Sequence, residues 1–214
     1  ADVFSSDFSA TAVVTGSDPI ENPSGPITTF GNLETGANTN PDQNLYLEFD
    51  GKIRGPVAKY DYGHHFLIQG HEIGADFGYV TRVNLDVTDP AHRVTLLTPV
   101  GGDGLTHFSA IDGSAYYPFT NALLFTQEKG GAKGGVFELS MHWPSKVTTH
   151  YGSMGVCSYE GIHPDADGRI YIVEDQSGKS VSNDPNNIDG EQKVAKQPGG
   201  YVYRFVPYDK ANLD

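Results

Sequence analysis

The chain repeats one pattern of residues: a β-strand that ends in an acidic residue, a glycine-rich connection and a second, aromatic-rich strand. The first copy occupies residues 66–72 and 78–85, and the second occupies residues 122–128 and 134–139. Glu72 and Glu128 precede the matching valines, at positions 80 and 136, by the same eight positions. A recurrence of this kind constrains the fold more strongly than any local propensity does.

A third copy covers residues 169–175, which end in Glu174 and Asp175, and continues after an insertion at residues 199–206. A strand is expected before each copy, over residues 54–57, 111–114 and 159–162. A further strand is expected after the first two copies, over residues 93–97 and 146–149. Groups of three or four strands that recur every ~40 to 55 residues are typical of the blades of a β-propeller.

We therefore expect an all-β fold, a β-propeller with three to four blades visible in residues 45–214. Residues 1–44 are rich in Ser, Thr, Asn, Pro and Gly, and we expect them to form an irregular N-terminal arm. Three or four blades leave sheet edges unpaired and do not close a ring. We expect a second chain, or the rest of a longer polypeptide, to complete it.

The propeller interpretation predicts where the acidic residues lie. The innermost strands of successive blades run side by side around an axis, so equivalent positions converge at one end of the channel. Carboxylates that meet in a partly dry site repel one another unless they bind a cation or take up protons. The sequence therefore predicts a calcium-type site, with six candidate ligands: Glu72, Asp112, Glu128, Glu160, Glu174 and Asp175.

The overall charge excludes some partners. The chain has 14 basic and 27 acidic residues, a formal charge of −13 that repels nucleic acids and anionic membranes. It has no apolar run long enough to predict a membrane span. Cys157 is the only cysteine, and we expect it to be a packed strand residue. The start at Ala1 fits the end left by a signal peptidase, so we expect a secreted or periplasmic protein.

An ordered series of motifs resembles the PhoX-type alkaline phosphatases, which are secreted β-propeller enzymes with calcium and iron in the channel. The resemblance covers roughly residues 50 to 210, and the order of the motifs is more specific than any one of them. It implies hydrolysis of a small phosphorylated substrate, with Glu128, Glu160, Glu174 and Asp175 as metal ligands. The matching segments are residues 124–128, 135–139, 159–161, 170–175 and 203–207.

Three positions depart from the family pattern. The family usually has Leu-Thr-Cys-Glu-Glu at residues 124–128, whereas this chain has Thr126 and Gln127 at the Cys and first Glu. It also has Tyr159 where the family usually has His. Because thiolate is the soft ligand that suits iron, we expect calcium as the cofactor and regard iron as doubtful.

Two other functions fit the same residues. Glu160 and the glycine after it also resemble gluconolactonase-like propellers, in which a similar Glu binds a divalent ion, so a lactonase-like hydrolase is one alternative. The other is a non-catalytic extracellular propeller that uses calcium for rigidity and its faces for binding. The sequence shows no nucleophile. The histidines beside the acidic strands are interpreted as surface or hydrogen-bonded structural residues: His64, His65, His71, His107 and His163.

Overall fold

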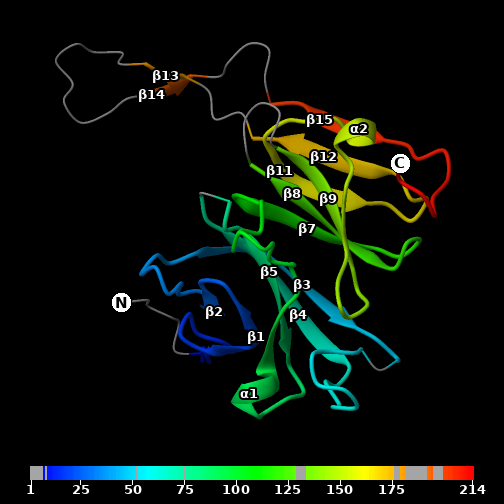
Figure 1. The fold of residues 1–214 in the computed structure, drawn as a ribbon. Helices are drawn as coiled ribbons and strands as arrows, with labels where there is room; N and C mark the ends of the chain where they lie inside the picture. The colour runs from blue at the N-terminus through cyan, green and yellow to red at the C-terminus, as the bar shows by residue number, and fades with distance from the viewer. Residues whose placement is uncertain are drawn as a thin grey trace.

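A computed structural model describes residues 7, 9–51, 53–74, 76–128, 134–175, 179–181, 192–194 and 200–214. Most of its regular structure is β-strand (Figure 1). The strands are β1 (Pro19–Ser24), β2 (Ile27–Thr29), β3 (Asn40–Glu48), β4 (His65–Glu72), β5 (Tyr79–Asn84), β6 (Val94–Leu96), β7 (Ile111–Tyr117), β8 (Ala122–Gln127), β9 (Gly135–Ser140), β10 (Val147–Thr149), β11 (Tyr159–Pro164), β12 (Ile170–Glu174), β13 (Lys179–Val181), β14 (Gln192–Val194) and β15 (Val202–Phe205). The helices are single turns, α1 (Pro90–Arg93) and α2 (Tyr151–Met154).

The larger sheets follow one another along the chain and are antiparallel throughout. The first sheet has the order β3-β4-β5-β6, the second β7-β8-β9-β10 and the third β11-β12-β15. Two hairpins, β1-β2 and β13-β14, form sheets of their own. The prediction of an all-β fold is confirmed. Within the described residues no sheet closes on itself, and the closure of a propeller ring stays a prediction.

Apolar side chains bury both faces of the second sheet. Successive residues of a strand point to opposite faces, so in β8 Leu123 and Phe125 pack with Phe66 and Ile68 of the first sheet. Leu124 packs on the other side with Ile172 of the third sheet. All of β8 is therefore buried, and each large apolar side chain buried in this way contributes about 1.5–3 kcal/mol. This packing fixes how the ends of the sheets lie relative to one another.

The first strands of the three larger sheets are neighbours in space. β7 contacts both β3 and β11, and Figure 1 shows the second sheet between the first and the third. The β1-β2 hairpin covers the remaining face of the first sheet, where Ile20 and Ile27 pack with Tyr79 and Val83. The tips of β3, β7 and β11 are thereby brought together.

The structure differs from the expected boundaries in the first copy of the repeat. Residues 54–57 were expected to be a strand, but they lie in the loop between β3 and β4. The strand that precedes β4 is β3, which begins at Asn40, inside the segment expected to be an irregular arm. β3 is an edge strand, where Pro41 is tolerated because no neighbour needs its missing N–H.

Among the described residues, no helix combines the length and the apolar composition that crossing a bilayer requires.

Candidate metal centre

Each of the three larger sheets has a β-bulge at the same place in its first strand. The pairing of β3 with β4 shifts between Pro41 and Asn44, that of β7 with β8 between Ile111 and Ser114, and that of β11 with β12 between Tyr159 and Ile162. A bulge sets two residues against one and redirects a side chain. The first residue inside each bulge is acidic: Asp42, Asp112 and Glu160.

A second acidic residue lies beside each bulge, on the neighbouring strand. The residues paired just before the bulges are His71, Gln127 and Glu174, and an acid follows each of them: Glu72, Glu128 and Asp175. The Glu128 N–H donates to the carbonyl of residue 110 over 2.9 Å, and the Asp175 N–H donates to that of residue 158 over 2.9 Å. The ladders thus continue for one more pair and hold both acids beside the bulges.

Three of these acids come close enough to share one ion. One carboxylate oxygen from each of Asp112, Glu128 and Glu160 lies within 4.8 Å of the others. Asp42 is hydrogen-bonded to Asp112, and Asp175 is hydrogen-bonded to Glu128. The five carboxyl groups come from all three larger sheets, and we call them the acidic cluster.

The charges of the acidic cluster oppose one another in the absence of a cation. Burial raises the pKa of Asp112 to about 9, with further contributions from the hydrogen bond and charge of Asp42 and from the charges of Glu160 and Glu128. Burial likewise raises the pKa of Glu128 to about 8, followed by the effects of Asp175 and Glu160. Every neighbouring group that shifts these two pKa values is acidic. A divalent cation would remove this repulsion, and oxygen ligands are those that Ca²⁺ prefers.

Thr126 and Gly113 join the second and third sheets at the acidic cluster. The Thr126 hydroxyl is buried and donates to the carbonyl of Glu160 over 2.7 Å. A Cβ added at Gly113 would lie 2.5 Å from the same carbonyl oxygen, so only glycine lets the two bulges approach this closely. These contacts set the spacing between Asp112 and Glu160.

The side chains of Thr126 and Gln127, which stand where the resemblance to PhoX-type phosphatases would place metal ligands, form hydrogen bonds within the fold. The Thr126 hydroxyl binds the Glu160 carbonyl, as described above. The Gln127 amide accepts from the Ser109 N–H at 3.2 Å and donates to the Tyr151 hydroxyl at 2.7 Å. Neither residue offers the soft sulfur ligand that iron favours, and the nearby donors are carboxylate oxygens. The donor set of the acidic cluster therefore consists of carboxylate oxygens, which could hold a metal ion.

The structure brings together four of the six predicted ligands and leaves two apart. Glu174 lies outside the acidic cluster because its carboxylate accepts from the Tyr203 hydroxyl at 2.7 Å, from the Tyr201 N–H at 3.2 Å and from the Cys157 thiol at 3.1 Å. These bonds, that of Tyr203 above all, lower its pKa. Glu72 holds the position of Glu128 in the first sheet, but it is not among the three residues whose oxygens converge.

The histidine at the end of β4 has a structural role. His71 is fully buried, with its two ring nitrogens 3.0 Å from the Thr39 hydroxyl and 2.9 Å from the Thr81 hydroxyl. Its ring stacks on Tyr79. Burial lowers the pKa of His71 to about 3, so the ring is neutral at physiological pH. The interpretation of this histidine as a hydrogen-bonded structural residue is confirmed.

Asp42 is the member of the cluster that the sequence interpretation missed. Residues 38–42 read as a turn, because Asn, Pro and Asp favour turns. A usable signal was present: Asp42 and Asp112 are each followed four positions later by a tyrosine, Tyr46 and Tyr116. Aligning the repeat on that spacing places Asp42 in register with Asp112.

A groove of about 540 Å³ runs along β3, β7 and β11, and none of the five carboxyl groups of the acidic cluster is among the described residues that line it. Gln43 and Ser114, which lie inside or just after the bulges, line one part of it, and Tyr116 and His163 line another. The Gln43 side-chain oxygen accepts from the Ser114 N–H at 3.1 Å, so the first and second sheets are joined here.

Comparisons with known protein families, curated proteins and solved structures find no match for this chain. The residues and their geometry therefore carry the functional argument.

Proposed function

We propose that the acidic cluster binds a divalent cation of the calcium type and that the chain is an exported, metal-dependent phosphomonoesterase. The observation that carries the proposal is the convergence of Asp112, Glu128 and Glu160, from two different sheets, to within 4.8 Å. Carboxylates placed so close are stable when a cation neutralises them. Held by these three carboxylates, such a cation would supply positive charge to attract phosphate oxygens and to offset the charge that develops in the transition state of phosphoryl transfer.

The chain's own residues provide the surroundings that the reaction requires. The three bulges direct carboxylates from separate strands at one point, and the sheet packing holds them there. The groove along β3, β7 and β11 is lined in part by Gln43 and Ser114, which lie inside or just after two of the bulges, and it has space for the organic part of a phosphomonoester. Its polar side chains, such as Gln43 and His163, are positioned to contact a bound substrate.

The proposal includes a propeller arrangement of the sheets. Antiparallel sheets that follow one another in sequence, pack face to face and place their first strands side by side are typical of successive propeller blades. In that arrangement the groove is part of the central channel. The other blades would come from a second chain or from the rest of a longer polypeptide. A secreted or periplasmic location would supply calcium at the millimolar levels that weaker carboxylate sites need.

The test is hydrolysis of p-nitrophenyl phosphate with added Ca²⁺ and with EGTA. We expect activity that depends on Ca²⁺ and falls at least tenfold in Glu128→Gln, which keeps the shape of the side chain and removes its charge. Glu174→Gln is the matched control, because Glu174 lies outside the acidic cluster, and it should retain activity.

The same assay separates the alternatives. Calcium-dependent hydrolysis of a lactone without phosphatase activity would replace the proposal with a lactonase-like hydrolase. Calcium binding without hydrolysis of either substrate would favour a non-catalytic binding propeller. Phosphatase activity that is equal in EGTA and Ca²⁺ would contradict the metal-dependent mechanism.

A further inference from the structure

A second pocket lies at the end of the sheets opposite the acidic cluster. The cluster lies near the pairs Asn40↔Glu72 and Gln127↔Gly135, at one end of the first and second sheets. The other end of these sheets is marked by the pairs Glu48↔His65 and Ala122↔Ser140. Two connections begin at that end: the loop between β3 and β4, and the turn between β9 and β10. The pocket lies between that loop and that turn and has a volume of about 660 Å³.

Its lining combines apolar surface with two positive charges. Tyr60 and Trp143, both half-buried, supply aromatic surface, and Pro56 lies between the basic residues Arg54 and Lys59. Among the described residues, no acidic residue lines the pocket, although the chain has 27 acidic and only 14 basic residues. This is a local reversal of the overall charge.

The two cations have no protein partner in the described part of the chain. Neither the Arg54 guanidinium nor the Lys59 ammonium forms an ion pair or a hydrogen bond there. Both side chains are exposed. An anionic group in the pocket would meet two positive charges without first displacing a carboxylate.

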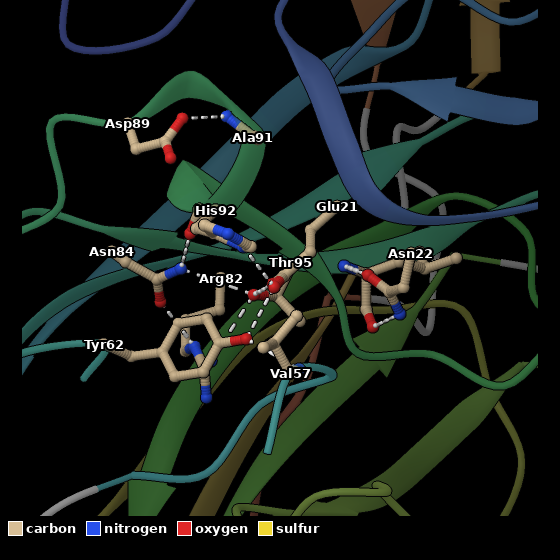
Figure 2. A network of polar contacts seen from close by, with 11 residues as sticks. Glu21, Asn22, Val57, Tyr62, Arg82, Asn84, Asp89, Ala91, His92 and Thr95 are labelled. Carbon is tan, nitrogen blue, oxygen red and sulfur yellow. Dashed lines mark hydrogen bonds and ion pairs between the residues drawn. The ribbon is translucent and has the colours of Figure 1, made fainter. Parts of the chain in front are cut away.

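A buried polar network fixes the backbone that forms the pocket. The Arg82 guanidinium donates to the Arg54 carbonyl at 3.0 Å, and the Tyr62 hydroxyl accepts from the Val57 N–H at 3.0 Å. The same hydroxyl donates to Glu21 at 2.5 Å. Figure 2 shows Glu21, Tyr62 and Arg82 directed toward one another beneath the loop.

Further contacts support this network and the wall of the pocket. His92 lies 2.7 Å from the Glu21 carboxylate, and its ring centroid is 4.1 Å from that of Tyr60. Arg82 and Tyr62 are each 1% exposed. Because buried polar groups with several partners resist displacement, the loop is preorganised, and a ligand does not have to order it.

We propose that this pocket binds a small amphipathic anion, an aromatic body that carries one carboxylate or sulfonate group. The aromatic body packs against Tyr60 and Trp143, and the anionic group lies near Arg54 and Lys59. This site goes beyond the proposed hydrolysis and does not depend on it, because none of its residues belongs to the acidic cluster.

The experiment uses Trp143, the only tryptophan in the chain, as the reporter. The probes are 1-anilinonaphthalene-8-sulfonate and N-phenyl-1-naphthylamine, which have nearly the same aromatic body but differ in the sulfonate. We expect the sulfonate probe to quench Trp143 saturably, with one site per chain. It should bind roughly tenfold more tightly than the neutral probe, since two cations attract it.

Two double variants test whether Arg54 and Lys59 cause the preference for the sulfonate probe over the neutral probe. Arg54→Gln combined with Lys59→Gln should reduce the affinity for the sulfonate probe to that for the neutral probe and leave binding of the neutral probe unchanged. Arg204→Gln combined with Lys210→Gln, which removes two exposed charges in the third sheet and the C-terminal segment, is the matched control. Unchanged neutral-probe binding shows that each variant is folded.

Three results would overturn the proposal. The first is the absence of saturable quenching by either probe. The second is equal affinity for the two probes in the unmodified chain. The third is an equal loss of sulfonate-probe affinity in the control variant, which would assign the effect to overall charge rather than to this pocket.

Discussion

Replacing Asp112 with asparagine should stabilise the metal-free protein while weakening its response to calcium. Asp112 is 4% exposed and lies among acidic neighbours. The amide of asparagine has nearly the same shape, can donate a hydrogen bond to Asp42 as a protonated Asp112 does, and carries no charge. Near pH 7 the substitution therefore removes the free-energy cost of holding a proton on Asp112, with little change in packing.

The size of the expected gain in stability follows from the pKa of Asp112, which rises from 3.8 in the unfolded chain to about 9 in the fold. Because this carboxyl pKa is raised, the contribution of Asp112 to stability is most favourable below about pH 4 and is lost as the pH rises toward 9. Between about pH 4 and pH 7 the full shift corresponds to about 4 kcal/mol, at about 1.36 kcal/mol for each pH unit. Protonation of the neighbouring acids also relieves repulsion, so we expect Asp112→Asn to recover about half of this free energy, roughly 2 kcal/mol.

The assay is thermal unfolding at about pH 7, in EGTA and in Ca²⁺. In EGTA, Asp112→Asn should raise the Tm by about 4–8 °C, since 1 kcal/mol corresponds to about 2–4 °C for a chain of this size. Calcium should raise the Tm of the unmodified protein, because a ligand that binds only the folded state stabilises it. It should raise that of the variant much less.

The control is Asp50→Asn, an exposed residue outside the acidic cluster that removes the same unit of charge. A Tm gain in EGTA that is equal in Asp112→Asn and Asp50→Asn would show that overall charge, and not the cluster, is responsible. A loss of stability in Asp112→Asn in EGTA would refute the reasoning.

Three further predictions test other parts of the structure. Because the pKa of buried His71 is lowered to about 3, the contribution of His71 to stability should be complete above about pH 6.5 and fall by about 1.4 kcal/mol for each pH unit below it. In urea unfolding, the stability of the unmodified protein relative to His71→Gln should therefore fall by that amount per pH unit below about pH 6.5, and a difference that does not change with pH would contradict this. Gly113→Ala should lower the free energy of unfolding by about 1–3 kcal/mol, because the added Cβ would lie 2.5 Å from the Glu160 carbonyl oxygen. Calorimetry should show calcium binding that is at least tenfold weaker in this variant. Unchanged binding would show that the spacing of the bulges is unimportant. Tyr62→Phe removes a hydroxyl that forms hydrogen bonds with a buried carboxylate and a loop N–H. It should lower the free energy of unfolding in urea by about 1–3 kcal/mol, whereas Tyr46→Phe, at an exposed tyrosine, should have no effect. Equal stability of the two variants would contradict the importance of the network.

The sequence predicted the strands that carry strong β-propensity. β4, β8 and β12 have the aromatic and β-branched composition that fits a pleated, buried surface, and each lies where the repeat places it. β3 was placed too late because residues 40–44 are Asn, Pro, Asp, Gln and Asn, which have low strand propensity. Its pairing with β4 overrides that local preference.

The acidic cluster was predictable only in part, because bulges decide which acids converge. Glu174 and Gln127 occupy equivalent positions before the acids Asp175 and Glu128. Whether a side chain at that position faces the cluster depends on the local ladder and on partners such as Tyr203, which lies 29 positions further along the chain. The second pocket was not predictable, because its loop is held by Arg82 from 28 positions away.

The central claim is that carboxylates from separate sheets bind one shared cation, and calorimetric titration with Ca²⁺ in two buffers of different ionisation enthalpy tests it most directly. Asp112 and Glu128, with pKa values raised to about 9 and about 8, hold protons near pH 7 without metal. We therefore predict one bound Ca²⁺ per chain, release of protons on binding, and loss of both in Glu160→Gln. The absence of binding, or binding that releases no protons and persists in Glu160→Gln, would contradict the claim.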